Sequence, residues 1–398
     1  MDSAEREGLR PKGNVPNLRF PEFQGEWEKC KVSDLLDFYS TNSLSWDKLE
    51  YGTDAIQNLH YGLIHVGLPT MIDLCKDKLP NITNGNTPKN YELCQEGDIA
   101  FADASEDTNE VAKAVEFYKL NGKDVICGLH TIHGRDNQQK TVVGYKGYAF
   151  SSTAFHHQIR RIAQGTKIYS INSKNFSECY IGIPSKEEQK KIATLLRLID
   201  ERISTQNKII DKLQSLIKGI RNDVFGKLRK NIGFNAVVGD VLDYEQPQSY
   251  IVEDTEYTNE GTPVLTANKA FVLGYTLETD GIYDKGDCII FDDFTLDCKY
   301  VDIPFKVKSS AIKILTAKNK ELLRYTFEFL KYLDLSTEEH KRHYIAETQN
   351  QEFIMPTEQM VKTIAHIFST LSLRMETAVK QRDVFEKQKQ YLLRQMFI

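Results

Sequence analysis

A long helical pattern occurs twice in this chain. The two copies align without a gap at an offset of 172 residues, so that Pro184 matches Pro356. The other matched pairs are Ile192 with Ile364, Ala193 with Ala365, Arg202 with Arg374, Lys208 with Lys380, Asp211 with Asp383 and Phe225 with Phe397. A repeat of this length predicts two similar halves, each a globular module followed by a rod-like helix.

Both copies carry apolar residues at alternating steps of four and three, which is the heptad seam of a paired helix. The residues predicted to pair the helices are Ile192, Leu196, Ile199, Ile203, Ile210 and Leu213 in the first copy and Ile364, Phe368, Leu371 and Met375 in the second. Gln206 interrupts the first seam. It either fixes the register of the helix pair or lies at a solvated edge of the seam. At 1.5 Å per residue each helix spans roughly 60 Å. An exposed seam of that length must be covered, and chain order favours antiparallel pairing because a parallel pair needs a long return connection.

The chain of 398 residues has room for two to three domains. Gly226 and the segment 231–233 are expected to end the first helix. Short strands and Gly, Asn and Asp turns between the helices predict an α+β fold: two mixed α/β modules, each followed by a long helix. The predicted parts are a flexible leader 1–13, a first module 14–184, a first helix 185–226, a second module 233–355 and a second helix 356–398.

Composition narrows the class of protein. No apolar run approaches the roughly 20 residues that a membrane span needs, and residues 1–13 lack the apolar region of a secretory signal. The seven cysteines are scattered without a C-x-x-C pair, which favours a reducing cytoplasm and argues against a structural zinc site. We therefore expect a cytoplasmic protein that does not contact a membrane.

The charge is unevenly distributed. The whole chain carries a net charge of −5. Residues 185–226 hold nine Lys and Arg against six acids, and residues 356–398 hold seven against four. Each helix is thus +3 and the rest of the chain −11. If the chain binds DNA, its modules must use local patches, or partner subunits must supply much of the positive field.

No catalytic motif is present in the sequence. Neither a G-x-x-x-x-G-K-[ST] loop nor a G-x-G-x-x-G turn occurs, and the Asn/Asp-Pro-Pro-aromatic tetrapeptide of amino-methyltransferases is missing. Candidate metal ligands are His130 with His133, His340 with His343, and Asp292, Asp293 and Asp297. The histidine pairs lack a third ligand at sensible spacing, and the aspartates fit a solvated turn better. We therefore expect no catalytic residue and no metal or cofactor in this chain.

Several polar segments suit DNA contact, because Arg, Asn and Gln make bidentate contacts with base edges. The candidate residues are His133, Arg135, Asn137, Gln138 and Lys140 in the first module and Asn268, Lys269 and Lys299 in the second. On this hypothesis, Arg135→Ala relaxes the first half of a DNA target. The competing interpretation is a solvated loop. A further cluster, His156 and His157 with Arg160 and Arg161, fits a partly structural role better.

Two motifs carry a family resemblance. Residues 18–27 (LRFPEFQGEW) and residues 183–193 (IPSKEEQKKIA), followed by Leu196 and Asp200, resemble the opening and the helix entry of the specificity subunits of type I restriction-modification systems. The resemblance extends over nearly the whole chain. The second helix entry departs from the family pattern, since Met360-Val361 replaces the usual Glu-Gln.

The resemblance implies two target-recognition domains that read the halves of a gapped double-stranded DNA sequence, with the helices as a ruler. It also implies partners: two methyltransferase subunits that use S-adenosylmethionine, and two restriction subunits that use ATP and Mg²⁺. Two other classes stay open. One is an enzyme with a fused methyltransferase or nuclease activity, and the other is a coiled-coil adapter that binds proteins and no DNA.

Overall fold

The computed structural model of the chain describes residues 13–267, 270–337 and 342–398. It divides into two compact units, one comprising residues up to Gln206 together with Gln381–Ile398 and the other Asn207–Lys380. In the described part of the chain, no helix combines the length and the apolar character that crossing a bilayer requires.

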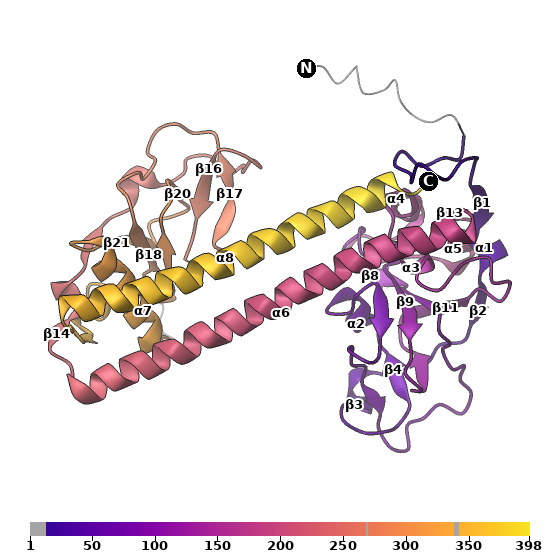
Figure 1. The fold of residues 1–398 in the computed structure, drawn as a ribbon, viewed down its shortest axis with the longest axis horizontal. Coiled ribbons are helices and arrows are strands. Elements are labelled where there is room, and N and C mark those ends of the chain that lie inside the picture. Colours follow the sequence, from indigo (N-terminus) through magenta and orange to yellow (C-terminus); the bar gives the residue numbers. More distant parts are fainter. Residues whose placement is uncertain (1–12, 268–269, 338–341) are drawn as a thin grey trace. The chain divides into compact units, whose positions relative to one another are not determined.

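Unit 1 is built around a five-stranded sheet with the order β2-β11-β7-β9-β5. Figure 1 labels β2, β9 and β11 of this sheet. Its strands are β2 (Asp37–Tyr39), β11 (Thr131–Arg135), β7 (Ile99–Ala102), β9 (Ala114–Lys119) and β5 (Met71–Asp73). All neighbours are antiparallel except β5 and β9. The central strand β7 is buried along its whole length.

A second sheet of unit 1 has the order β10-β4-β6-β3, with β10 and β4 parallel. Its strands are β10 (Val125–Cys127), β4 (Gln57–Leu59), β6 (Asn81–Ile82) and β3 (Leu49–Glu50). Two small ribbons pair β1 (Glu28–Lys31) with β13 (Tyr180–Ile183) and β8 (Ala104–Ser105) with β12 (Tyr169–Ser170). The short helices are α1 (Val32–Leu35), η2 (Trp46–Lys48), α2 (Tyr61–His65), α3 (Lys146–Phe150), α4 (Thr153–Ile162) and α5 (Ser173–Ser177).

Unit 2 holds a four-stranded sheet, β15-β21-β18-β19, and a three-stranded sheet, β17-β16-β20. The strands are β15 (Asp243–Glu245), β21 (Ile312–Thr316), β18 (Cys288–Asp292), β19 (Cys298–Val301), β17 (Val272–Thr276), β16 (Thr262–Leu265) and β20 (Lys306–Val307). A ribbon pairs β14 (Ala236–Val237) with β22 (Glu352–Phe353). The helical segments are η3 (Val238–Asp240), η4 (Gln248–Tyr250), α7 (Lys320–Leu333) and η5 (Thr348–Asn350).

The main sheets of the two units follow the same plan. In each, an early strand (β2 or β15) pairs with a late strand (β11 or β21), which pairs with a buried central strand (β7 or β18). The Gly-Asp turns at Gly97 and Gly286 lead into those central strands, and both glycines have a positive φ that side chains rarely adopt. The internal repeat read from the sequence therefore extends to the folded modules.

The two long helices are α6 (Lys186–Asn231) and α8 (Glu358–Gln395). The expectation that Gly226 interrupts the first helix is wrong, because α6 continues through it to Asn231. A single helical glycine costs only about 1 kcal/mol relative to alanine, and the buried Phe225 and Leu228 on either side hold this turn in the core of unit 2.

Within unit 1, the start of α6 packs against the end of α8. Ile192, Leu196 and Ile199 share one core cluster with Leu392 and Met396. Farther along, Asp200 forms an ion pair with Lys389 at 2.7 Å, and the Arg202 guanidinium lies 5.5 Å from the Phe385 ring centre. Positions that ascend along α6 therefore meet positions that descend along α8, so the two helices are antiparallel.

Within unit 2, the end of α6 lies beside the start of α8. The strand that follows α6 and the strand that precedes α8, β14 and β22, pair with each other, and the Asn235 side chain bonds the backbone of Met355 in both directions. The buried Ile364 and Phe368 of α8 share a core with Ile217 of α6, and Leu371 and Met375 pack against it. The predicted fold class, with antiparallel helices, is thus confirmed in each unit. Of the remaining seam positions, Ile203 packs against the unit 1 core, Ile210 is buried and Leu213 half-buried. The Oε1 atom of Gln206 is buried and has no hydrogen-bond partner among the described residues.

The opening motif ties both helix ends to the first module. Arg19 donates from Nε and Nη2 to the buried Glu188 carboxylate in the first turn of α6, both at 2.7 Å. The Leu18 amide donates to the Gln395 carbonyl at the end of α8. The Trp27 ring stands edge-on to Phe397, with ring centres 6.4 Å apart.

In unit 2, one buried carboxylate joins α7 to both long helices. Glu328 accepts from Arg221 of α6 at 2.9 and 2.7 Å and from Arg324 of α7 at 2.7 Å. Arg324 in turn donates to the Phe368 carbonyl and the Ser372 hydroxyl of α8. The helices are therefore fixed to the second module by charge pairs as well as by the seam.

Candidate nucleic-acid interface

The segment 130–140 of the first module is mostly not the loop that its polar sequence suggested. Thr131–Arg135 forms β11, which is hydrogen-bonded on one side to β2 and on the other to β7. His133 has no exposed surface, and Arg135 is 8% exposed. The expectation of a polar loop is therefore wrong over these five residues, because the strand's polar side chains find partners inside the module.

Those partners form a buried ionic network. Arg135 donates from Nε and Nη2 to Asp98 at 2.9 and 2.8 Å and from Nη1 to Glu92 at 2.7 Å. The Nε2 atom of His133 lies 2.7 Å from Asp98 Oδ2, the oxygen that also accepts from Arg135 Nη2. Burial alone would raise the pKa of Asp98, but the bonds from His133 and Arg135 outweigh burial and hold the pKa below its ordinary value. Whether His133 and Arg135 touch DNA stays a prediction, although in this structure Arg135 is engaged inside the module.

The turn after β11 does present polar groups to solvent. The Asp136 carboxylate accepts from the amides of Lys140 and Thr141 at 3.1 and 2.8 Å and so closes the turn. Asn137 and Gln138 are exposed on it. The Asn137 amide nitrogen donates to Asp37 and Tyr39 at 2.7 and 2.8 Å, which fixes its direction at the end of β2.

The lysines singled out in the sequence have different surroundings. Lys140 donates to the Asp34 carbonyl at 3.2 Å and is half-buried. Lys299 is half-buried on β19, opposite Ile290. Asn268 and Lys269 lie outside the described residues, so their predicted DNA contact has no structural account.

The cluster of histidines and arginines on α4 is partly structural. Arg160 donates to Asn109 at 2.9 Å and lies 2.7 Å from the ring nitrogen of His157. Burial lowers the pKa of His156, so that ring favours the neutral form. Arg161 is exposed.

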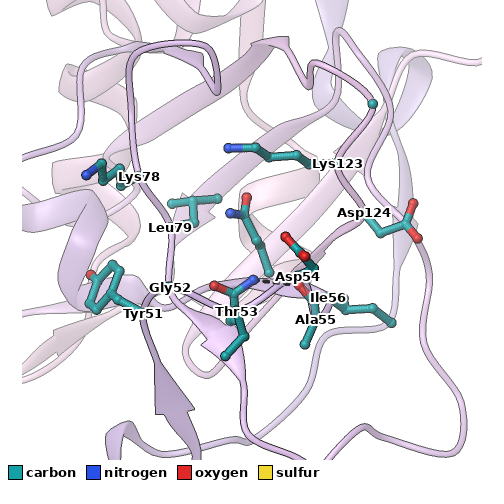
Figure 2. A pocket seen from close by; sticks show the side chains of 13 residues that line it. Tyr51, Gly52, Thr53, Asp54, Ala55, Ile56, Lys78, Leu79, Lys123 and Asp124 are labelled. Carbon is teal, nitrogen blue, oxygen red and sulfur yellow. Dashed lines mark hydrogen bonds between the residues drawn. The ribbon is translucent and has the colours of Figure 1, made fainter.

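A cleft of about 640 Å³ opens beside the second sheet of unit 1. Figure 2 shows its lining, with Tyr51 and Lys78 near one end and Asp124 near the other. Lys123 and Asp54 complete its charged groups, so the lining holds two lysines and two aspartates. This cleft has polar edges and an exposed aromatic ring, but no net positive charge of its own.

The metal-ligand pairs considered from sequence spacing do not converge. His130 bonds Asp103 at 3.2 Å, whereas His133 faces Asp98. His340 lies outside the described residues. A turn does follow β18 and Asp297 is exposed after it, but the expectation that Asp292 and Asp293 are solvated is wrong, because both are buried.

Asp293 accepts from Lys313, Arg342 and the amides of His343 and Tyr344. Burial alone would raise the pKa of Asp293, but these partners outweigh burial and lower it. Its carboxylate is thus occupied by protein donors.

A different group of ligand-type side chains does come together. Cys94, Cys127 and His133 are all buried, and their ligand atoms lie within 4.8 Å of one another. Sequence analysis did not group them, because they come from three segments and no two of them have a metal-motif spacing.

Comparison with known proteins places these features in a family context. Residues 77–215 match the family described as the type I restriction modification DNA specificity domain. The specificity subunit of the type I restriction enzyme EcoR124I/EcoR124II from Escherichia coli is 44% identical over 126 residues, which are 30% of this chain and 31% of that protein. A putative type I restriction enzyme MjaX specificity subunit from Methanocaldococcus jannaschii is 26% identical over 218 residues, or 54% of this chain and 49% of that protein. This chain thus matches less than half the length of either curated relative.

Solved structures share the fold. The crystal structure of a type I restriction-modification system S subunit from M. genitalium has a TM-score of 0.64 at 15% identity and covers 96% of this chain and 99% of that one. A chain from a structural study of assembly and conformational transition in the type I R-M system has a TM-score of 0.50 at 13% identity, covering 92% and 96%. These structures show the same fold, and the resemblance stated from the two sequence motifs is confirmed by the family match over residues 77–215 and by the 44% identical relative.

Proposed function

We propose that this chain is the DNA-specificity subunit of a type I restriction-modification complex, and that it reads a bipartite target and leaves catalysis to other subunits. The observation that carries the proposal is the match of residues 77–215 to a DNA specificity domain. The second module supports it, because its main sheet repeats the strand order of the first. Two similar modules in one chain favour two half-sites in one target.

The turn after β11 is the proposed base-reading element of the first module. Asn137 and Gln138 are exposed there, and side-chain amides pair with the N6 and N7 edge of adenine. The Asn137 amide donates both of its hydrogens to Asp37 and Tyr39, so its Oδ1 atom is oriented in advance and is the atom that can accept from adenine N6. Pre-orientation lowers the entropy cost of binding.

The cleft beside the second sheet is a further candidate contact surface. Its two lysines can meet phosphates, and the exposed Tyr51 ring can pack on a sugar or base. Phosphate contacts position a protein on DNA without reading sequence. With two aspartates in the same cleft, the positive field for DNA must come partly from elsewhere in the complex.

The outer faces of the helices are the proposed docking surface for methyltransferase subunits. Apolar side chains outside the seam are exposed on both helices. On α6, Ile209 and Leu216 are seven residues apart and so share a face, as do Val384 and Tyr391 on α8. Exposed apolar groups in such a row are typical of protein interfaces, and each helix also carries an excess of positive charge.

The test is to express the chain with the modification subunits of its system and to map methylated adenines in the host genome. The expected result is one gapped motif that disappears when this chain is omitted. Methylation by the purified chain alone with DNA and S-adenosylmethionine would instead establish a fused enzyme. A motif that persists without the chain, together with no DNA binding by the complex, would favour a protein adapter.

A further inference from the structure

Three buried side chains in the first module have the chemistry of a metal site. The sulfur atoms of Cys94 and Cys127 lie 3.6 Å apart, and a ligand atom of His133 lies within 4.8 Å of each. Cys127 ends β10 of the second sheet, His133 lies in β11 of the main sheet, and Cys94 lies in the segment before β7. The group therefore stands where the two sheets of unit 1 meet.

The histidine is oriented as metal-bound histidines are. Its Nε2 atom lies 2.7 Å from the Asp98 carboxylate. An ionised carboxylate has no hydrogen to donate and can only accept, so Nε2 carries the proton. Its Nδ1 atom is buried and has no hydrogen-bond partner among the described residues. A carboxylate that holds one imidazole nitrogen while the other is left for a metal is the usual outer-shell arrangement of zinc ligands.

A metal-free core explains these atoms less completely. A weak S–H···S bond accounts for the two sulfurs, but the buried Nδ1 of His133 then stays unsatisfied, which costs free energy. A disulfide is not formed, because the sulfurs are well beyond the ~2.05 Å of an S–S bond.

The donor set selects the kind of metal. Two thiolates and an imidazole suit Zn²⁺, whereas Mg²⁺ and Ca²⁺ prefer oxygen ligands. Charge balance also fits: Zn²⁺ offsets the two thiolates, and Arg135 offsets Asp98. A buried group of charges is tolerated when it is neutralised in this way.

We propose that Cys94, Cys127 and His133 bind one Zn²⁺ ion that joins the two sheets of the first module, with Asp98 orienting the histidine and water completing the coordination. This proposal replaces the expectation, drawn from cysteine spacing, that the chain holds no metal. The zinc proposal does not depend on whether the chain reads a DNA sequence. The turn that bears Asn137 follows β11 directly, so the ion also steadies the strand that leads into it.

The experiment is to purify the full chain without metal-affinity resin and to measure zinc by mass spectrometry and its ligands by X-ray absorption at the zinc edge. The expected result is about one zinc per chain, with two sulfur neighbours and the remainder nitrogen or oxygen. Because this measurement uses the unmodified chain, it does not depend on whether a variant folds.

The zinc content of two variants tests whether the ion is bound at these residues. Cys127→Ser is expected to lose most of the bound zinc, whereas Cys298→Ser is the matched control, since Cys298 is also buried and strand-borne but lies in unit 2. Seven titratable thiols in the denatured chain and no bound metal would overturn the proposal. So would a mass two hydrogens lower, which indicates a disulfide, or zinc content that is equal in all three proteins.

Discussion

Replacing Arg135 tests whether this side chain has a structural role or contacts DNA. The substitution is also the sharpest test of how the first module is built. The guanidinium bonds Asp98 twice, Glu92 once and the Leu93 carbonyl once, at 2.7–2.9 Å, and it stacks on Tyr39 with 4.4 Å to the ring centre. Arg135→Met keeps an unbranched aliphatic stem in the same position and removes all of these donors.

The expected cost follows from the carboxylate left behind. Asp98 has a side chain only 2% exposed, so it would stay buried and keep His133 as its only side-chain partner among its present contacts. Removing one partner of a buried pair costs about 3–5 kcal/mol. With a urea dependence near the upper end of the usual 1–3 kcal/mol per molar, the unfolding midpoint of the module should fall by about 1–2 M.

Tryptophan fluorescence is the assay, because the chain has two tryptophans, Trp27 and Trp46, and both lie in unit 1. The signal therefore reports unfolding of the first module. Arg135→Lys is the matched control: it keeps the charge, but an ammonium lacks the planar fork that holds two carboxylates, so an intermediate midpoint is expected. An unchanged midpoint for Arg135→Met, combined with relaxed recognition at one base, would refute the structural role and restore the DNA contact predicted from the sequence.

The remaining predictions concern the reading turn, the helices and the second module. Asn137→Ala or Gln138→Ala should relax one position of the first half-site by about 1–3 kcal/mol without moving the urea midpoint; a uniform loss over all sequences would place the residue on phosphate. Inserting four residues at matched points in α6 and α8 adds about 6 Å, so the gap in the methylated motif should grow by about two base pairs of 3.4 Å; altered half-sites would contradict the ruler. Glu328→Ala leaves two arginines without their shared carboxylate and should destabilise unit 2 by about 3–5 kcal/mol, whereas Glu328→Gln should cost less; equal thermal midpoints for both would exclude a charge effect. The pKa of Asp293 is lowered in the fold, so its stabilisation is present above its ordinary value of 3.8 and is lost as pH falls through the lowered value; Asp293→Asn should therefore flatten the acid limb of stability measured by urea titration, and an unchanged acid limb would count against this.

The parts of the fold that sequence predicts are those with a period or a repeat. The seam of α6 was readable because Ile192, Leu196 and Ile199 follow the helical period and need no knowledge of distant residues. The antiparallel order followed from connection length alone. Gly226 was misjudged because its helix propensity is a weak local preference, which the packing of Phe225 and Leu228 overrides.

The candidate site was less predictable, because its partners are distant in sequence. Arg135 looks like a base-reading side chain until Asp98, 37 residues earlier, is seen to bind it. The cysteines of the proposed zinc site are separated by 33 residues and meet because the Cys94 amide donates to the Val125 carbonyl of β10. One signal was available: Asp98 is the aspartate of a Gly-Asp turn that recurs as Gly286-Asp287 in the second module, so a structural carboxylate there was open to inference.

Phe397 has a consequence for how the protein is made. The ring centre of Phe397 lies 6.4 Å from that of Trp27 and 6.0 Å from that of Tyr145, so positions 27 and 397, far apart in the chain, share one core. At 5–20 residues per second, the ribosome supplies Phe397 roughly 10–40 s after it has finished the first module. During that interval the nascent module carries an uncovered apolar face and is open to chaperones. A ribosome-arrested chain that stops at Asn231 should accordingly expose Trp27 to a water-soluble quencher, and protection at that length would show that the module closes without waiting.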